Sequence, residues 1–387
     1  MAHIVMISTA DWDHPLWTNK QHVACALSDQ GHSVLYVESL GLRGATSSGK
    51  DWFRILRRIK KALLPPQNVY KNIWVFSPLV IPGASNFILI SINRILLALG
   101  IRISLILLDL RYEWLWTYYP LTARILNLKR FYKTIYHAVD AIQEQPRMPR
   151  SLILNEERTL CRQVDHVFVT SPQIERDLKI YSKRIKYYPN CCDYNHFSKA
   201  LTIKERDFPV ELSTIDSPII GFIGAISNYK LDFSLINKLA GLHPEWNFVF
   251  IGPTCEGEDN TDISLLSNLN NIYLLGYRDY EHLPFYCAAF DIGWLPLKIN
   301  SYTQSMFPMK FFEYLAAGLP VIATAIDSLS SFKKESKLCN PSVQEFSDAI
   351  FSTLHGSSSN LDLRIKLAKN NTYQKRTSNM IQDINNI

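Results

Sequence analysis

Short β-rich runs alternate with longer amphipathic stretches along most of the chain. The run "HIVMIST" is followed by the helix-like "KQHVACALSDQG" and then by a second β-rich run, "SVLYVES". This β-α-β order is typical of a parallel sheet. Further strands are predicted at "IWVFS", "SLILLDL", "DHVFVTS" and "IKYYPN". We therefore expect a first Rossmann-like domain over residues 1–197.

The alternation begins again after a polar, irregular segment at residues 198–216. Strands are predicted at "PIIGFIGAIS", "WNFVFIGP", "NIYLLGY", "FDIGWLP" and "PVIAT". They indicate a second domain over residues 217–355, followed by a polar helical tail over 356–387 that could pack back on the first domain. The predicted fold class is α/β, with two Rossmann-like doubly wound domains.

The most apolar stretch is "FILISINRILLALGIRISLILLDL", which is interrupted by Asn93, Arg94, Gly100 and Arg102. We interpret it as a buried helix followed by a buried strand, not as a membrane span. The first residues lack a basic segment leading into a long apolar core, so no signal peptide is expected.

Composition narrows the class of ligand only slightly. The net charge of +6 and the pI near 8.8 suit an anionic small ligand, an anionic membrane surface or nucleic acid. The seven cysteines are scattered, without paired CxxC motifs, which favours a reducing, cytoplasmic compartment over a disulfide framework or a zinc site. No GxGxxG fingerprint occurs, so NAD binding is not supported.

The stretch "FPMKFFEYLAAGLPVIAT" carries the most specific chemistry. Pro308 suits the start and Gly318 the end of a helix of about three turns, on which Lys310 and Glu313 share one face. A lysine at a helix N-terminus favours phosphate, and a carboxylate one turn later can accept hydrogen bonds from a ribose diol. The alternative is an ordinary ion pair on a solvated face.

Two further segments offer ligand contacts. In "GFIGAIS", Gly221 and Gly224 allow close approach of the backbone to a ligand, although two glycines also mark an ordinary turn. After the strand "NIYLL", Tyr277 and Arg278 offer an aromatic plane and a cation to a nucleobase or diphosphate. The alternative is a tyrosine at the edge of the core and a surface arginine.

These segments resemble the nucleotide-sugar domain of GT-B glycosyltransferases. The resemblance rests on "IGFIGAI", "FVFIGP", "NIYLLGYRDYEHLPFYCAAFDIGWLP" and "FPMKFFEYLAAGLPVIAT", and it is greatest to the family 4 type that bacteria use for cell-surface polysaccharides. "YYPNCCDYNHF" is similar to that family's interdomain segment, and "DWDHPLWTNKQHVACALSDQGHSVLYVE" to its first β-α-β unit. The resemblance implies two domains that face each other across a cleft.

The resemblance also implies roles for individual residues. Glu313 would bind the donor ribose and Lys310 the diphosphate, while Tyr277 and Arg278 would line the base pocket. Gly224 would let the phosphate and sugar approach the loop after its strand. One feature departs from the family: Ser305 stands eight positions before Glu313, where many members carry a second glutamate that contacts the donor sugar.

The first domain of such enzymes builds the acceptor side. Its loop "TADWDHPLW" holds Asp11, Asp13 and His14, any one of which could act as general base in an inverting enzyme. The alternative is a turn-capping aspartate and a surface histidine. His137 and Asp140 in "IYHAVDA" are a second candidate pair. In a retaining enzyme, which we favour, the donor phosphate can assist, and these residues would only orient sugar hydroxyls.

The segment "WFRILRRIKKALLPP", residues 52–66, predicts a basic amphipathic helix. Such a helix suits an anionic membrane surface and would bring the enzyme to a polyprenyl-diphosphate acceptor. The alternative is a solvated helix packed on the sheet.

The sequence therefore predicts a glycosyltransferase of the hexosyltransferase type. It would move a sugar from a UDP- or GDP-type donor to a glycan or lipid-linked acceptor in cell-surface polysaccharide synthesis. We expect no metal, no cofactor and no nucleic-acid partner, and a cytoplasmic protein peripheral to the inner face of the plasma membrane. Two alternatives remain open: a nucleotide-sugar epimerase or hydrolase of the same fold, and a non-catalytic protein that binds sugar nucleotides or glycans.

Overall fold

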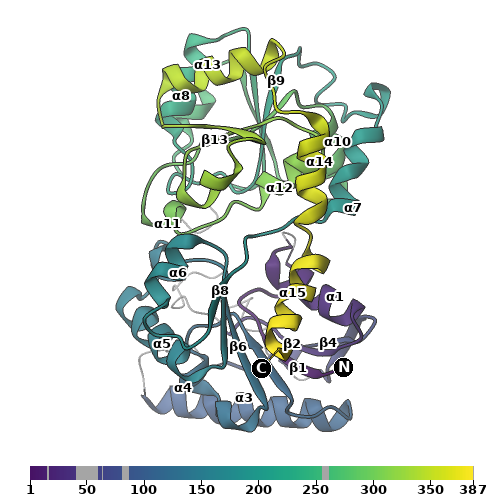
Figure 1. Ribbon diagram of the computed structural model, residues 1–387, viewed down its shortest axis with the longest axis vertical. Coiled ribbons are helices and arrows are strands. Elements are labelled where there is room, and N and C mark those ends of the chain that lie inside the picture. The colour runs from purple at the N-terminus through teal and green to yellow at the C-terminus, as the bar shows by residue number, and fades with distance from the viewer. Residues whose placement is uncertain (15–16, 41–59, 63, 81–86, 255–260, 387) are drawn as a thin grey trace. The chain divides into compact units, whose positions relative to one another are not determined.

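The chain forms two compact units, each built around a parallel sheet (Figure 1). The computed structural model describes residues 1–14, 17–40, 60–62, 64–80, 87–254 and 261–386. Unit 1 consists of two segments, Met1–Tyr188 and the residues from Thr377 onward, and unit 2 is Pro189–Arg376. Unit 1 thus ends before the predicted boundary at residue 197, and the predicted tail is divided between the two units.

Unit 1 contains an eight-stranded sheet of order β3-β4-β2-β1-β5-β6-β7-β8, parallel except for the antiparallel edge strand β3. Its strands are β1 (His3–Ile7), β2 (Ser33–Val37), β3 (Gln67–Tyr70), β4 (Ile73–Phe76), β5 (Trp114–Thr117), β6 (Lys133–Ala138), β7 (His166–Val169) and β8 (Ile185–Tyr187). The central strand β1 aligns Ile4 with Val34 of β2 and with Trp114 of β5. Because helices cover both faces of such a sheet, its central strands consist mainly of buried apolar residues.

The helices of unit 1 are α1 (Asn19–Asp29), α3 (Phe87–Leu107), α4 (Thr122–Ile125), α5 (Arg150–Gln163) and α6 (Pro172–Leu178), with 3₁₀ turns at Leu128–Arg130 and Ile142–Glu144. Helix α1 is the one predicted from "KQHVACALSDQG", and Gly31 follows it with φ at +87°. On α5, the buried Glu157 accepts a hydrogen bond from the Tyr136 hydroxyl at 2.5 Å. Burial raises the pKa of Glu157 to about 7.

The prediction for the most apolar stretch was wrong in two respects. Residues 87–107 form a single helix of 21 residues, so "SLILLDL" belongs mainly to a helix and not to a strand. The helix is also only partly buried, since 22% of Ile88–Leu107 lies inside the structure. A continuous apolar run such as "SLILL" shows no periodicity that would separate a buried strand from a helix, which explains the error.

The last helix, α15 (Tyr373–Asn385), carries the chain from unit 2 back into unit 1. Within unit 1 its carboxylate Asp383 binds the Lys186 amine at 2.7 Å and accepts a hydrogen bond from the Tyr188 hydroxyl. The Lys133 amine donates to the Ile384 carbonyl. The end of the chain is thus fastened beside β6 and β8.

Unit 2 contains a six-stranded parallel sheet of order β11-β10-β9-β12-β13-β14. Its strands are β9 (Ile219–Ile223), β10 (Asn247–Ile251), β11 (Ile272–Gly276), β12 (Ile292–Leu295), β13 (Val321–Thr324) and β14 (Ser336–Cys339). The first five are the strands predicted for this half. Strand order reverses between β9 and β12, and open α/β sheets bind ligands at the carboxyl ends of the strands at such a point.

The helices of unit 2 are α7 (Tyr194–Phe197), α8 (Phe233–Leu242), α9 (Ser264–Ser267), α10 (Leu283–Ala288), α11 (Ser301–Gln304), α12 (Lys310–Ala316), α13 (Val343–Leu354) and α14 (Leu361–Asn370). The 3₁₀ turns are Ser198–Thr202, Glu205–Asp207, Tyr280–His282 and Asp327–Phe332. Helix α12 lies in the core of this unit, with Phe311, Phe312 and Leu315 fully buried. Each such side chain stabilises the fold by about 1.5–3 kcal/mol, which fixes the position of α12 against the sheet.

Candidate functional site

Three neighbouring strands of unit 2 end in a glycine with positive φ. Gly224 follows β9 with φ at +154°, Gly252 follows β10 at +146°, and Gly276 ends β11 at +73°. A Cβ on Gly252 would lie 2.0 Å from the Gly224 carbonyl oxygen, so the loops after β9 and β10 touch backbone to backbone. Only glycine permits this combination of φ and close contact. Gly252 was not predicted as a site residue, although the "IGP" after its strand is a signal for a tight turn.

Lys310 and Glu313 form an ion pair at the start of α12. The Glu313 side chain is 3% exposed and that of Lys310 is 22% exposed, so the pair is not on a solvated face. The Lys310 amine also lies 5.3 Å from the centre of the Phe197 ring. A cation held by a buried carboxylate and an aromatic ring is in place to meet an anionic ligand.

Helix α12 is shorter than predicted. It has seven residues, Lys310–Ala316, because the turn before it closes through a hydrogen bond from Phe311 N–H to the Pro308 carbonyl, at 3₁₀ spacing. Gly318 ends it with φ at +83°, as the sequence indicated. The loop that leads to the helix is held by the Asn190 amide, which donates to the Phe307 carbonyl at 2.6 Å.

Tyr277 and Arg278 follow β11, and their side chains have different surroundings. Tyr277 is 37% exposed, whereas Arg278 donates to Glu211 at 2.8 Å and to the Tyr286 hydroxyl at 2.7 Å. Hydrogen bonds, first from Tyr286 and then from Arg278, hold the pKa of Glu211 at about 2. Through Glu211, the Arg278 guanidinium therefore links the segment 198–216 to the residues after β11. The predicted role of Arg278 in a base pocket stays a prediction.

The loop after β9 carries a buried hydroxyl. Ser227 is fully buried, and its Oγ has no hydrogen-bond partner among the described residues. The same loop lies beside the loop after β12, where the Lys298 amine donates to Asn228 at 2.7 Å and the Lys298 N–H to the Lys230 carbonyl at 2.9 Å. Ser227 and Lys298 thus lie where the strand order reverses, and sequence reasoning missed both.

Replacing Ser227 by alanine is expected to leave the free energy of unfolding unchanged or to raise it by up to about 1 kcal/mol, because a buried hydroxyl without a partner does not stabilise the fold. If the Ser227 hydroxyl binds a donor nucleotide sugar, the Kd of the variant for that donor should also rise about 2- to 10-fold. Urea denaturation and calorimetric titration measure the two effects. Ser171→Ala is the contrasting variant: Ser171 caps α6 by accepting from Ile174 N–H at 3.2 Å, and its loss should cost about 1 kcal/mol. A clear destabilisation by Ser227→Ala would contradict the prediction.

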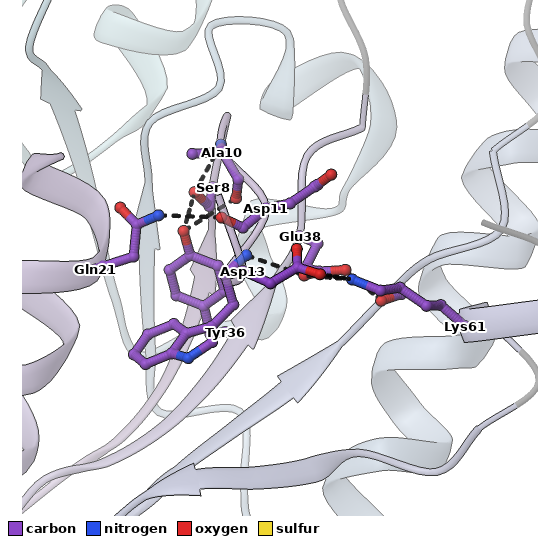
Figure 2. Close-up of polar contacts among 10 residues, drawn as sticks. Ser8, Ala10, Asp11, Asp13, Gln21, Tyr36, Glu38 and Lys61 are labelled. Atoms are coloured by element: carbon purple, nitrogen blue, oxygen red, sulfur yellow. Dashed lines mark hydrogen bonds and ion pairs between the residues drawn. The ribbon is translucent and has the colours of Figure 1, made fainter. Parts of the chain in front are cut away.

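In unit 1 a group of charged side chains lies at the carboxyl ends of β1 and β2 (Figure 2). The Lys61 amine binds Asp13 at 3.0 Å and Glu38 at 3.5 Å. Glu38 is buried, accepts from the Trp12 N–H at 2.9 Å, and accepts from the Ser77 hydroxyl. The predicted residue Asp13 therefore belongs to a carboxylate–amine cluster. Glu38 and Lys61 were not predicted as site residues.

Further contacts, several of them around the Tyr36 hydroxyl, fix the loop after β1 (Figure 2). Tyr36 bonds the Ser8 hydroxyl at 2.7 Å and the Ala10 carbonyl at 3.0 Å, and the Gln21 amide donates to the Asp11 carbonyl at 3.0 Å. The loop backbone is thereby ordered on a rigid strand and helix. Such a support holds a site in a defined geometry.

The other predicted residues of unit 1 lie in unlike environments. His14 is exposed, and its N–H donates to the Asp11 carbonyl at 3.3 Å. Asp140 lies 3.9 Å from the Lys20 amine. His137, on β6, is fully buried among aromatic rings, with the Tyr118 ring centre 5.0 Å away. Solvent does not reach His137, so its surroundings would have to open before it could act as a base.

Among the residues that the structure describes, no group of three or more His, Cys, Asp or Glu side chains could hold a metal ion. Cys191 and Cys192 are buried free thiols, and burial raises the pKa of both. They therefore lack the thiolate character of reactive cysteines. The predicted basic helix 52–66 lies mostly outside the described residues.

Comparison with known proteins agrees with this arrangement. Residues 217–355 match the family model glycosyl transferases group 1. The putative teichuronic acid biosynthesis glycosyltransferase TuaH of Bacillus subtilis (strain 168) is 31% identical over 233 residues. That match covers 57% of this chain and 57% of the relative, so this chain spans little more than half of the relative's length.

Solved structures of low identity share the fold along the whole chain. Sucrose-phosphate synthase of Thermosynechococcus elongatus is 17% identical, with a TM-score of 0.71 and coverage of 99% of this chain and 98% of that one. Anabaena HepE in complex with UDP-glucose is 15% identical, with a TM-score of 0.68 and full coverage of both chains. The matches confirm the resemblance seen in the sequence: the chain has the GT-B fold, and residues 217–355 are similar to the glycosyl transferases group 1 family.

Proposed function

We propose that this protein transfers a sugar from a nucleotide diphosphate sugar to a glycan or lipid-linked acceptor in the synthesis of a cell-surface polysaccharide. The observation that carries the proposal is the ion pair between the half-buried Lys310 and the buried Glu313, within the residues that match the glycosyl transferases group 1 family. The similarity to a putative teichuronic acid glycosyltransferase supports the polysaccharide setting.

The donor we propose is a UDP-sugar. HepE has been solved with UDP-glucose, and an E. coli relative of the same fold with UDP-2-fluoro glucose. In this chain the Glu313 carboxylate would accept hydrogen bonds from the two ribose hydroxyls. The Lys310 ammonium has three donors, and those not used by Glu313 can meet diphosphate oxygens. Lys310 would thereby stabilise the leaving diphosphate without a metal ion.

The acceptor would meet the ordered loop after β1. Asp13 and Glu38, held by Lys61, can accept hydrogen bonds from sugar hydroxyls. We propose a retaining reaction in which a donor phosphate oxygen takes the proton of the acceptor hydroxyl, while Asp13, His14 and Asp140 orient the acceptor. An inverting reaction would instead require one of them as general base. We propose that the enzyme is cytoplasmic and acts on a polyprenyl-diphosphate-linked glycan.

One observation favours a second candidate, a non-catalytic protein that binds sugar nucleotides. Ser305 stands where many relatives of this type carry a glutamate, and it is buried at the end of α11. A serine cannot supply the charge of that carboxylate. Tight donor binding without turnover on any acceptor would support this candidate.

Donor binding can be tested by thermal unfolding with UDP, GDP, ADP and CMP and their common sugar conjugates. A ligand at 100 times its Kd stabilises the folded state by about 2.7 kcal/mol, so the UDP series should raise the Tm by roughly 5–10 °C. Transfer of labelled sugar from the stabilising donor to membrane lipid extracts then tests the reaction. No shift with any diphosphate would contradict the donor site. Release of free sugar without an acceptor would favour a hydrolase or epimerase.

A further inference from the structure

Helix α3 of unit 1 presents a row of large apolar side chains to solvent. Ile95 is 59% exposed and Ile106 is 69% exposed, values that are unusual for isoleucine in a folded chain. The exposed apolar residues of the helix are Ile88, Ile92, Ile95, Leu99, Ile103, Ile106 and Leu107. Their spacing of three and four residues places them along one face of the helix.

The opposite face of α3 is part of the core of unit 1. Leu97, Ile101 and Leu105 are buried there. A Cβ on Gly100 would lie 2.4 Å from the ring of Phe76, so the helix backbone rests directly on the end of β4. The helix is long and apolar enough to cross a membrane by length and composition, but the face that packs on β4 holds it to the folded unit. Its exposed face can only lie on a surface that accepts apolar groups.

The charge of the helix indicates which surface that is. Arg94 and Arg102 are both exposed, and residues 87–107 contain no Asp or Glu. Long arginine side chains can place their cations at a polar boundary while neighbouring apolar side chains are buried. Apolar residues flanked by cations on one helix match an anionic lipid surface.

We propose that the exposed face of α3 docks on an anionic lipid surface, with the helix lying in the plane of the headgroups. A second copy of the chain is a less suitable occupant. Two antiparallel α3 helices paired about their centres would bring Arg94 of each near Arg102 of the other, and neither helix carries a carboxylate to offset the repulsion. Anionic headgroups offset the same two charges. The proposal adds a membrane contact within the described residues and does not depend on the transferase reaction.

Flotation with lipid vesicles tests the proposal without any substrate. The full chain should float with vesicles of phosphatidylglycerol and phosphatidylcholine, and not with phosphatidylcholine alone. The triple variant Ile95→Gln/Leu99→Gln/Ile103→Gln should bind the anionic vesicles at least about tenfold more weakly. Arg94→Gln/Arg102→Gln should bind roughly 10- to 30-fold more weakly and depend less on salt than the unaltered chain.

The matched control is Ile180→Gln/Val210→Gln/Leu363→Gln, which replaces the same number of exposed apolar side chains outside α3. It should bind vesicles as the unaltered chain does, and circular dichroism should show that all variants are folded. Equal binding by the α3 triple variant, equal binding to neutral vesicles, or no binding by the unaltered chain would each overturn the proposal. A dimer in light scattering that the α3 variant dissociates, without vesicle binding, would assign the face to a second copy instead.

Discussion

Replacing Glu313 by glutamine is expected to weaken UDP binding by about 10- to 100-fold. A hydrogen bond to a charged group contributes about 1.5–3 kcal/mol, and the amide keeps the shape of the side chain without its charge. Glutamine is preferred to alanine because the Glu313 side chain is only 3% exposed, so truncation would leave a cavity and an unpaired Lys310 ammonium. Titration calorimetry with UDP measures the change in Kd.

Glu281→Gln is the matched control for this experiment. Glu281 is exposed on the 3₁₀ turn Tyr280–His282, so the same chemical change there should leave the Kd unaltered. Circular dichroism and the Tm without ligand would show whether each variant is folded. An unchanged Kd in folded Glu313→Gln would remove Glu313 from the donor site and with it the main support for the proposed function.

The second large effect concerns the pH dependence of stability. Burial raises the pKa of Glu157 from 4.5 to about 7 in the folded state. Between these two values the folded state binds more protons than the unfolded state, so the free energy of unfolding falls as the pH rises. Titration of this one carboxyl group lowers the free energy of unfolding by a total on the order of 3 kcal/mol, and the decrease is complete once the pH exceeds the folded pKa.

Glu157→Gln should remove this loss, because the amide does not titrate and its oxygen can still accept from the Tyr136 hydroxyl. Urea denaturation at about pH 5 and about pH 8 measures the change for both proteins, and the difference between them isolates Glu157 from the other titrating groups. Unit 1 of the variant should be the more stable at the higher pH. Equal changes in the two proteins would show that Glu157 titrates near its ordinary pKa.

Much of the fold could be predicted because local patterns agree with it. Strands β1, β2 and β9–β13 coincide with short β-rich runs, and the reversal of strand order follows from two successive sets of β-α-β units. Four strands were not foreseen: β3, β5, β6 and β14 lie in segments whose apolar pattern is short or mixed with polar residues. Helix α3 was divided wrongly because its residues are apolar on both faces.

The candidate site was predictable only where chemistry is local in the chain. Lys310 and Glu313 are three residues apart, so their pairing follows from helix geometry, but their burial depends on the packing of α12. Arg278 is held by Glu211, which is 67 positions away. Glu38 lies near the loop of Asp13 because β1 and β2 are neighbours in the sheet, and Lys61, 48 positions after Asp13, binds both carboxylates. Contacts of this kind depend on tertiary structure and leave no pattern in nearby residues.

The return of the chain into unit 1 at Thr377 affects how the protein is made. Domains generally fold as they leave the ribosome, beginning with the N-terminal part of the chain. Here the residues that fasten Lys133, Lys186 and Tyr188 follow the whole of unit 2 in the chain. Unit 2 can therefore complete its sheet while unit 1, although it begins first, still lacks its closing helix. Translation must pass through all of unit 2 before the first unit is whole.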